Sequence, residues 1–267
     1  AVKSGGTIVW SWHLWFTASS WTATYTYGSK NFMTMPLGFI DSSGSGTATP
    51  RTLPFTFTQD ISSGKTTTVL VSQNGDASTG GTCTFYQWGR KDPMLRSGTS
   101  AAVGSFNVTG CATSVAATIQ NPNVFNTQDG TNYKNWWTND GTPVTFYNYC
   151  DASQTTTGAA DRQIVKTVYD PSPVGFHIPC GATFTGFSKS NGGTWDNGYT
   201  WDNNFFQAAG YRDRESGVVY VVGSYGDYWS AASAASSYTL NFSLSAVRPQ
   251  DNYDRAYGFS VRPVARP

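Results

Sequence analysis

The chain has 267 residues, of which 39% are hydrophobic, 15% aromatic and only 12% charged, with a formal net charge of +1. This length fits one large domain or two small ones, so it does not decide the domain count. A low charge with many Gly, Ser and Thr residues is typical of a β-dominated extracellular protein. The balanced charge without a basic run argues against nucleic-acid binding. No apolar stretch approaches the roughly 18 residues of a membrane span.

The first predicted strand spans residues 7–16, where apolar side chains alternate with other side chains. No secretory leader precedes it, so we expect that any export signal was removed or was never present. One face of the strand would carry these apolar side chains: Ile8, Trp10, Trp12, Leu14 and Phe16. We interpret them as core, in preference to a stacking platform for sugar rings, because large aromatic residues usually fill an interior.

Two segments follow that predict strands with clear ends. Residues 66–71 predict a strand that the turn pair Asn74-Gly75 stops. Residues 82–94 predict a strand that runs into a charged turn at 90–93, which reads Arg-Lys-Asp-Pro. These charges could clamp a ligand, but ion pairs within the turn are the favoured interpretation.

The middle of the chain predicts little regular structure. Residues 114–120 predict a short helix, because Asn121-Pro122 would end it. Residues 191–204 are dominated by Gly, Asn, Asp and Trp, so we predict a long loop there.

The C-terminal part, residues 210–267, is predicted to contain two strands with a polar loop between them. In residues 238–245 and 257–263, apolar and polar positions alternate, which indicates one apolar and one polar face in each strand. Tyrosines are frequent here beside Ser, Gly and Asn, and that composition is typical of a binding surface. A tyrosine-rich sheet edge without a binding role remains the alternative.

The residues with chemical potential do not form a recognisable catalytic or metal-binding pattern. The chain has four cysteines, which allow three pairings: Cys83, Cys111, Cys150 and Cys180. Disulfides and buried free thiols both remain open. His13 and His177 lie outside any zinc-binding spacing. We therefore predict no metal, no cofactor and no enzymatic activity.

Four segments occur together in a characteristic order: FYQWGRKDPM (85–94), TVYDPSPVGFHIPCGATFTGF (167–187), GDYWSA (226–231) and YGFSVRPV (257–264). In this order they resemble the Fibrobacter succinogenes major paralogous domain family, over residues 60–267 and at the opening TIVWSWHLW. The resemblance implies a C-type-lectin-like fold, which is a β-dominated α+β fold with few short helices and long loops. It implies one elaborated domain over residues 1–267.

The chain also departs from that family. The family usually has Cys where Ser172 stands, and the calcium-binding tripeptides of sugar-binding lectins are missing. We therefore carry neither a disulfide nor a metal site over from it. Within the family, the chain most resembles the variable proteins of diversity-generating retroelements and related pilus tip adhesins of gut anaerobes. Adenine-directed mutagenesis of such proteins yields no Lys, Met, Glu, Gln or Trp. Residues 218–257 contain no Lys, Met or Glu, and the resemblance implies that Gln250 and Trp229 are fixed or arise otherwise.

The resemblance implies a non-catalytic, adhesin-like module at the bacterial cell surface, with a diversified ligand-binding surface within residues 210–267. Its partner would be a protein or glycan on a cell or phage-host surface, and a pilus or lipoprotein chain could carry it. The alternatives are a structural pilus subunit and, less favoured, a glycan-active enzyme with carboxylates such as Asp202, Asp213 and Glu215.

The predicted ligand contacts share exposure on these strands or their loops: Tyr220, Tyr225, Asp227, Tyr238, Ser243, Arg248, Gln250, Asp251, Asn252, Tyr253, Asp254 and Tyr257. Tyr253 and Tyr257 are the predicted anchors. Hydrogen-bond specificity is assigned to the polar residues Asp251, Asn252 and Asp254. The apolar neighbours Leu240, Phe242, Phe259 and Val261 are predicted to be core.

Overall fold

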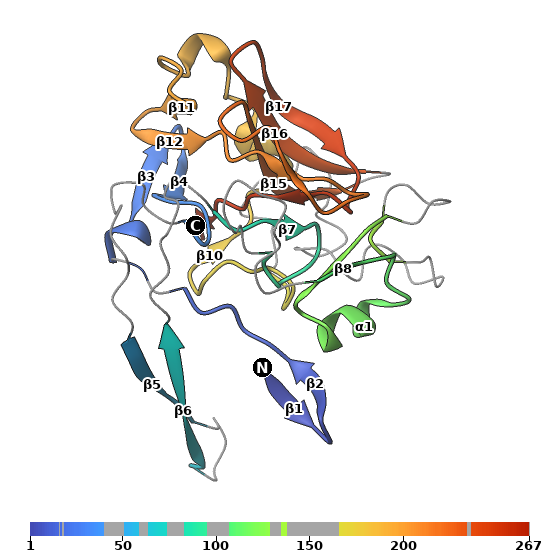
Figure 1. The fold of residues 1–267 in the computed structure, drawn as a ribbon. Coiled ribbons are helices and arrows are strands. Elements are labelled where there is room, and N and C mark those ends of the chain that lie inside the picture. The colour runs from blue at the N-terminus through green and yellow to red at the C-terminus, as the bar shows by residue number, and fades with distance from the viewer. Residues whose placement is uncertain are drawn as a thin grey trace. The chain divides into compact units, whose positions relative to one another are not determined.

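The structure, a computed structural model, describes residues 1–15, 17, 19–39, 51–58, 64–73, 83–94, 107–128, 135–137, 166–233 and 236–266. These residues form a strand-dominated α+β fold, in which α1 (Val115–Gln120) is the one α-helix (Figure 1). None of the helices described is long and apolar enough to cross a membrane. The chain divides into two compact units, residues 1–39 with 82–267 and residues 40–81.

The C-terminal sheet of the first unit is three-stranded and antiparallel. Its order is β15 (Tyr225–Ser233), β16 (Ser237–Ser243) and β17 (Val247–Tyr253), which Figure 1 shows side by side. A four-stranded sheet is ordered β14 (Val219–Tyr220), β13 (Tyr211–Arg212), β18 (Gly258–Phe259) and β7 (Tyr86–Gln87). Another is ordered β10 (Phe176–His177), β19 (Val264–Ala265), β4 (Lys30–Met33) and β3 (Thr24–Tyr27).

The other sheets are pairs of strands. Three are antiparallel: β1 (Val2–Ser4) with β2 (Thr7–Trp10), β11 (Gly198–Trp201) with β12 (Asn204–Gln207), and β5 (Arg51–Thr58) with β6 (Thr66–Gln73). β8 (Asn107–Thr109) pairs with β9 (Val124–Asn126) in parallel. The short 3-10 helices are η1 (Ser19–Trp21), η5 (Gly181–Phe184) and η6 (Lys189–Asn191).

Apolar clusters cover both faces of the C-terminal sheet. Neighbouring residues of a strand point to opposite faces, and Tyr228 and Trp229 of β15 accordingly enter two different clusters. Tyr228 packs with Leu240 and Phe242, whereas Trp229 packs with Phe259. The central strand β16 is therefore buried on both sides. The prediction that the polar side of residues 238–245 faces solvent is wrong, because the cluster that contains Trp229 and Phe259 covers that side.

Gly226 allows β15 and β16 to approach closely. It lies directly opposite Phe242, and a Cβ added at Gly226 would lie 2.1 Å from Phe242 Cζ. We expect Gly226→Ala to lower the free energy of unfolding by about 1–3 kcal/mol, because the ring has to move within a packed core. Urea denaturation measures this. Gly110→Ala is the control, since nothing lies within 4 Å of its added Cβ; equal effects at both positions would contradict the packing argument.

The N-terminal segment differs from its prediction. β2 ends at Trp10, and the irregular segment beyond it leaves Trp12 54% and Leu14 41% exposed. Among the described residues, β2 pairs with β1 alone, so its sheet in this part of the chain has two strands. The core interpretation is therefore wrong for Trp12 and Leu14. Phe16 lies outside the described residues.

Two segments predicted as loops contain strands. Residues 191–204 include β11 and lead into β12 through Asp202 and Asn203, whose φ values of 42° and 53° suit a two-residue hairpin turn. Asp and Asn tolerate this left-handed conformation better than most residues. The predicted polar loop after β16 is mostly β17.

Two other predicted elements are confirmed. The predicted helix is α1, capped by Ser114, and β6 includes the strand predicted at residues 66–71. The predicted stop of that strand at Asn74-Gly75 lies outside the described residues.

The predicted C-terminal strand at residues 257–263 is shorter than expected. Only β18 (Gly258–Phe259) is a strand there, and the segment continues into β19. Both of its predicted faces are buried, since Val261 on one and Arg262 on the other are 0% exposed. The predicted core positions Leu240, Phe242, Phe259 and Val261 are confirmed as buried.

Candidate functional site

Five tyrosines beside the C-terminal sheet, four of them linked by ring contacts, are here called the tyrosine face: Tyr211, Tyr220, Tyr225, Tyr253 and Tyr257. Tyr211 and Tyr220 lie opposite each other on β13 and β14, with ring centroids 6.2 Å apart. Tyr211 and Tyr257 meet edge to face at 5.5 Å, and Tyr257 meets Tyr253 in the same way at 5.7 Å. Tyr225 begins β15, two residues before Asp227 on the same face of the sheet.

The ring of Phe259 packs against the rings of three of these tyrosines, Tyr211, Tyr253 and Tyr257. It is fully buried on β18 and lies 5.2 Å from Tyr253, 5.4 Å from Tyr257 and 6.1 Å from Tyr211. Aromatic pairs at such distances add to the stabilisation from burial alone. The contacts with Phe259 therefore fix the rings of Tyr211, Tyr253 and Tyr257 at their bases. Tyr220 and Tyr225 remain 47% and 38% exposed.

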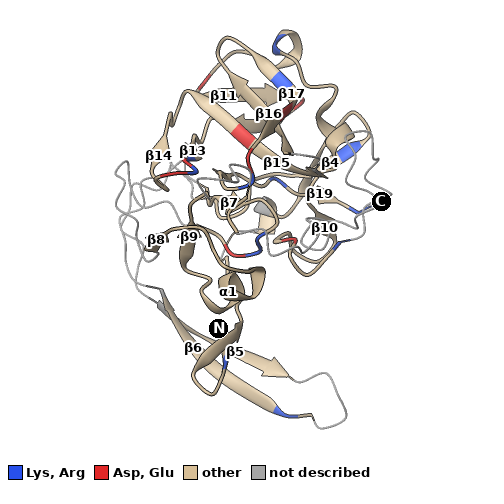
Figure 2. Cartoon of the chain, turned by 90° about the vertical axis from the view of Figure 1, so that its right-hand side faces the viewer, with Lys and Arg blue, Asp and Glu red and all other residues tan. Residues whose placement is uncertain are grey.

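A row of polar side chains lies on the same side of the sheet. Asp227 is paired with Asn241 across β15 and β16, and Thr239 is paired with Asp251 across β16 and β17. Asn241 Nδ2 donates to Asp227 Oδ1 at 2.8 Å, and Arg248 donates to Asn241 Oδ1 at 3.2 Å. Charged residues are sparse on these strands (Figure 2). Asp227, Thr239 and Asn241 are at most 1% exposed, and these buried polar side chains are here called the polar floor.

Burial dominates the electrostatics of this floor. It raises the pKa of Asp227 to about 7; the hydrogen bond from Asn241 acts in the opposite direction, and the charge of Asp251 adds to the rise. Burial also raises the pKa of Tyr253, and the carboxylates of Asp227 and Asp251 add to that shift. The pKa of Tyr211 is raised by burial first, and then by the charges of Asp213 and Asp227.

The structure brings part of the predicted contact set together. Tyr220 and Tyr225 are exposed, Arg248 is exposed, and Tyr253 and Tyr257 are half-buried within the tyrosine face. Asp251 lies beside them on β17 and is close to Arg248, at 4.0 Å between Oδ2 and NH1.

Other predicted contacts lie elsewhere. Asp227 and Ser243 are buried, and Ser243 is engaged with Ser245 at 3.0 Å, so neither offers an exposed side chain. Tyr238 and Asn252 pair with each other and, by alternation, lie on the opposite face of the sheet. Gln250 and Asp254 each have a partner within the protein.

These two partners are structural. Gln250 Nε2 donates to the carbonyl oxygen of Gly181 in η5 at 3.0 Å. Asp254 forms an ion pair with Arg214, whose guanidinium lies 5.2 Å above the ring of Tyr257. Asp254 therefore helps to orient Arg214 over the anchor ring.

Sequence reasoning missed several members of the site: Tyr211, Asp213, Thr239 and Asn241. Tyr211 and Asp213 lie in GYRDRES, where the Tyr-x-Asp spacing places two side chains on one side of an extended segment. Thr239 and Asn241 were assigned to the polar side of a strand, which was expected to face solvent. No pattern within the strand itself reports what packs against that side.

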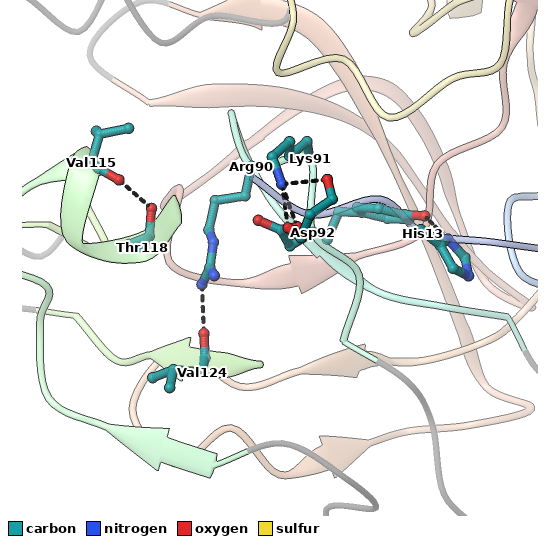
Figure 3. Close-up of polar contacts among 9 residues, drawn as sticks. His13, Arg90, Lys91, Asp92, Val115, Thr118 and Val124 are labelled. Atoms are coloured by element: carbon teal, nitrogen blue, oxygen red, sulfur yellow. Dashed lines mark hydrogen bonds and ion pairs between the residues drawn. The ribbon is translucent and has the colours of Figure 1, made fainter. Parts of the chain in front are cut away.

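The charged turn of residues 90–93 is structural (Figure 3). Lys91 Nζ lies 2.6 Å from both Ser11 Oγ and Asp92 Oδ1, and Ser11 Oγ donates to Asp92 Oδ1 at 2.6 Å. Arg90 donates to the carbonyl oxygen of Val124 at 2.7 Å. The predicted salt-linked turn is thus confirmed, and it fastens the N-terminal segment. Nearby, burial lowers the pKa of His13 to about 4, against the opposing charge of Asp92.

Within the part of the chain that the structure describes, no disulfide joins Cys83, Cys111 and Cys180 to one another, and Cys150 lies outside the described residues. Cys83 Sγ lies 3.0 Å from Ser260 Oγ, and Cys180 Sγ lies 3.3 Å from Thr183 Oγ1. In the part of the chain that the structure describes, no three His, Cys, Asp or Glu side chains are grouped as metal ligands.

Comparisons of the chain with protein-family models, curated proteins and solved structures found no match. The structure itself therefore gives the class of this protein. It is a strand-dominated α+β protein in which the tyrosine face lies beside a buried, partly acidic polar floor.

Proposed function

We propose that this chain is a non-catalytic, adhesin-like ligand-binding module of the bacterial cell surface, on a C-type-lectin-like fold, and that the tyrosine face contacts the ligand. The observation that carries this proposal is the contact of three tyrosine rings with the buried ring of Phe259. Tyrosines held in this way bind at low entropic cost, because little side-chain freedom remains to be lost.

The position of the tyrosine face also supports a diversified surface. Four of its tyrosines, and all three strands of the C-terminal sheet, lie within residues 218–257, where Lys, Met and Glu are absent. We propose that the codons of this segment are diversified by a diversity-generating retroelement. The backbone pairing of β15, β16 and β17 does not depend on the exposed side chains, so such positions tolerate exchange.

The first experiment changes only exposed rings. Tyr220→Ser combined with Tyr225→Ser should weaken binding to a ligand found on a glycan and protein-ectodomain array by at least tenfold, as expected for interface anchors. The melting temperature should stay nearly constant, because both side chains are largely exposed. Tyr25→Ser is the matched control, since Tyr25 is 48% exposed on β3, outside the tyrosine face.

Unchanged binding by the double variant, or an equal loss in the control, would overturn the proposal. Tyr253 and Tyr257 are tested with phenylalanine instead of alanine, because alanine would also remove the packing on Phe259. The genetic part has its own test: the gene should lie near a template repeat that differs from it only at adenines.

A structural pilus subunit is the second candidate, and the hairpin of β5 and β6 favours it. These strands pair only with each other among the described residues, and Val69 and Leu70 are 48% and 69% exposed. Exposed strand edges with apolar side chains add further strands readily. Light scattering at high concentration that detects self-association, abolished by Leu70→Lys, would favour this function over the first.

A further inference from the structure

Tyr211 lies at the centre of the tyrosine face, with two carboxylates near it: Asp213 follows it by two residues, and the bridge between Gly210 and Gly226 brings the β15 segment that carries Asp227 alongside. The ring of Tyr211 is flanked by those of Tyr220 and Tyr257. After burial, the charges of Asp213, two residues along the chain, and of Asp227 on β15 both raise the pKa of the Tyr211 phenol. Tyr211 is half-buried and Asp213 is partly exposed, so a ligand can reach both.

These two carboxylates have no cationic partner among the described residues. Arg214 is engaged by Asp254 and Glu215, and Arg248 lies near Asp251. Asp213 Oδ1 instead accepts backbone hydrogen bonds from the turn that follows it, at 3.0 Å and 2.9 Å. Asp227 accepts from the neutral amide of Asn241. When ionised, the pair therefore adds negative charge that this part of the chain does not neutralise.

The polar floor contains a further unsatisfied group. Thr239 is 0% exposed, and within the described residues its Oγ1 has no hydrogen-bond partner. It lies on the same side of the sheet as Asp227 and pairs across the strands with Trp229 and Asp251. Buried hydroxyl groups are normally paired, so an orphaned one calls for an explanation. The polar floor therefore contains a buried oxygen that the described residues leave without a hydrogen-bond partner.

We propose that the part of the tyrosine face around Tyr211, flanked by Asp213 and Asp227, binds a guanidinium or ammonium group, namely an arginine or lysine side chain of a protein partner. The proposal rests on the proposed function and specifies its ligand as a protein. A cation over an aromatic ring is attracted by the electron-rich ring face, and nearby carboxylates strengthen that attraction. Asp213 and the rings make the contact, and the buried charge of Asp227 acts through the low-dielectric interior.

The test uses n-butylguanidinium chloride as the probe and n-butylurea as its neutral counterpart of similar shape. Binding is followed by NMR shifts of the tyrosine ring signals. We expect the cation to shift the signals of Tyr211, Tyr220 and Tyr257, and the urea to leave them unchanged. Asp213→Asn and Asp227→Asn should each weaken binding about fivefold, the order of effect of one cation–π or charge contact.

Asparagine retains one acceptor oxygen at each position, which is enough for the hydrogen bonds of the turn and for the bond from Asn241, since each uses Oδ1 alone. Asp202→Asn is the control, because it removes one negative charge from the turn between β11 and β12, outside the tyrosine face. It should leave binding unchanged. Equal binding of the cation and the urea, or equal effects of all three variants, would overturn the inference.

Binding of the cation should also fall as the pH is lowered through about 7, where Asp227 takes up a proton. The other charged or titratable groups that face Asp227 are Asp251 and Arg248 on β17, the phenols of Tyr211 and Tyr253, and Asp213 through Tyr211. Asp227→Asn assigns the effect, since it should abolish this pH dependence. A pH dependence that persists in Asp227→Asn would contradict the role of Asp227.

Failure of this inference differs from failure of the proposed function. An array ligand that needs Tyr220 and Tyr225 but tolerates both aspartate substitutions overturns the cation site and leaves the binding module in place. A ligand that needs none of these side chains overturns both.

Discussion

Arg262→Met is expected to lower the free energy of unfolding by about 3–5 kcal/mol, because it leaves buried carbonyl groups without donors. Arg262 is 0% exposed. Its Nε donates to the carbonyl oxygen of Met33 at 2.8 Å, and its NH2 donates to that of Thr34 at 2.8 Å. A third bond goes to the carbonyl oxygen of Phe205, and the guanidinium lies 4.1 Å from the ring centroid of Phe206.

This one side chain thus joins β4, β12 and the C-terminal segment. Burial lowers its pKa to about 10, with Tyr228 acting in the opposite direction, so the guanidinium stays charged at neutral pH. Urea denaturation at pH 7 measures the loss. Arg266→Met is the control, since Arg266 is exposed only four residues later. A loss below about 1 kcal/mol, the scale of an ordinary net hydrogen bond, would contradict the bridging role of Arg262.

Asp227→Asn is expected to increase stability at pH 8, by up to about 4 kcal/mol. The pKa of Asp227 is raised from 3.8 to about 7 in the folded chain, and each unit corresponds to about 1.4 kcal/mol. Between these two values the folded state holds a proton that the unfolded state has lost. The stability of the wild-type chain therefore falls as the pH rises from about 4 to about 7, and then levels off with respect to this group.

The variant lacks this titration, so its advantage should be absent near pH 4, grow up to about pH 7 and stay constant above it. Thermal melts at a series of pH values measure the difference, and Asp202→Asn is again the control. An advantage that does not depend on pH would show that the buried carboxylate is not its cause.

The stability that the chain loses at neutral pH by burying Asp227 is relevant to the proposed function. A buried carboxyl that lowers stability at neutral pH, beneath a tyrosine-rich surface, is expected if the proposed binding needs a charge that folding does not. The two experiments on Asp227 are complementary, because the same substitution should increase stability and weaken cation binding.

Local patterns predicted the elements whose cause is local. Ser114 caps α1 and Asn121-Pro122 ends it, and both signals lie within a few residues of the helix. The strand at residues 66–71 is likewise visible as a run of β-branched residues. The turn at residues 90–93 contains its own ion pair between Lys91 and Asp92. Such elements need no information from distant parts of the chain.

The composition of the proposed binding region was also visible in the sequence, but its geometry was not. The abundance of tyrosine in the C-terminal part indicated a contact surface, and Tyr253 and Tyr257 do lie in one aromatic group. The partner that completes this group, Tyr211, comes from β13, more than 40 residues earlier. Strand pairing across that separation brings the rings together, and no short pattern encodes it.

By itself, therefore, the sequence determined the β-dominated class, the capped helix, the salt-linked turn and the tyrosine-rich C-terminal region. The tertiary structure alone decided which side chains of that region are accessible. Alternation along β16 shows that its two faces differ, but burial depends on what packs against each face. Phe259 and Trp229 cover the polar side, so Asp227 and Thr239 lie in the floor, whereas Trp12 is 54% exposed although alternation placed it on the apolar face.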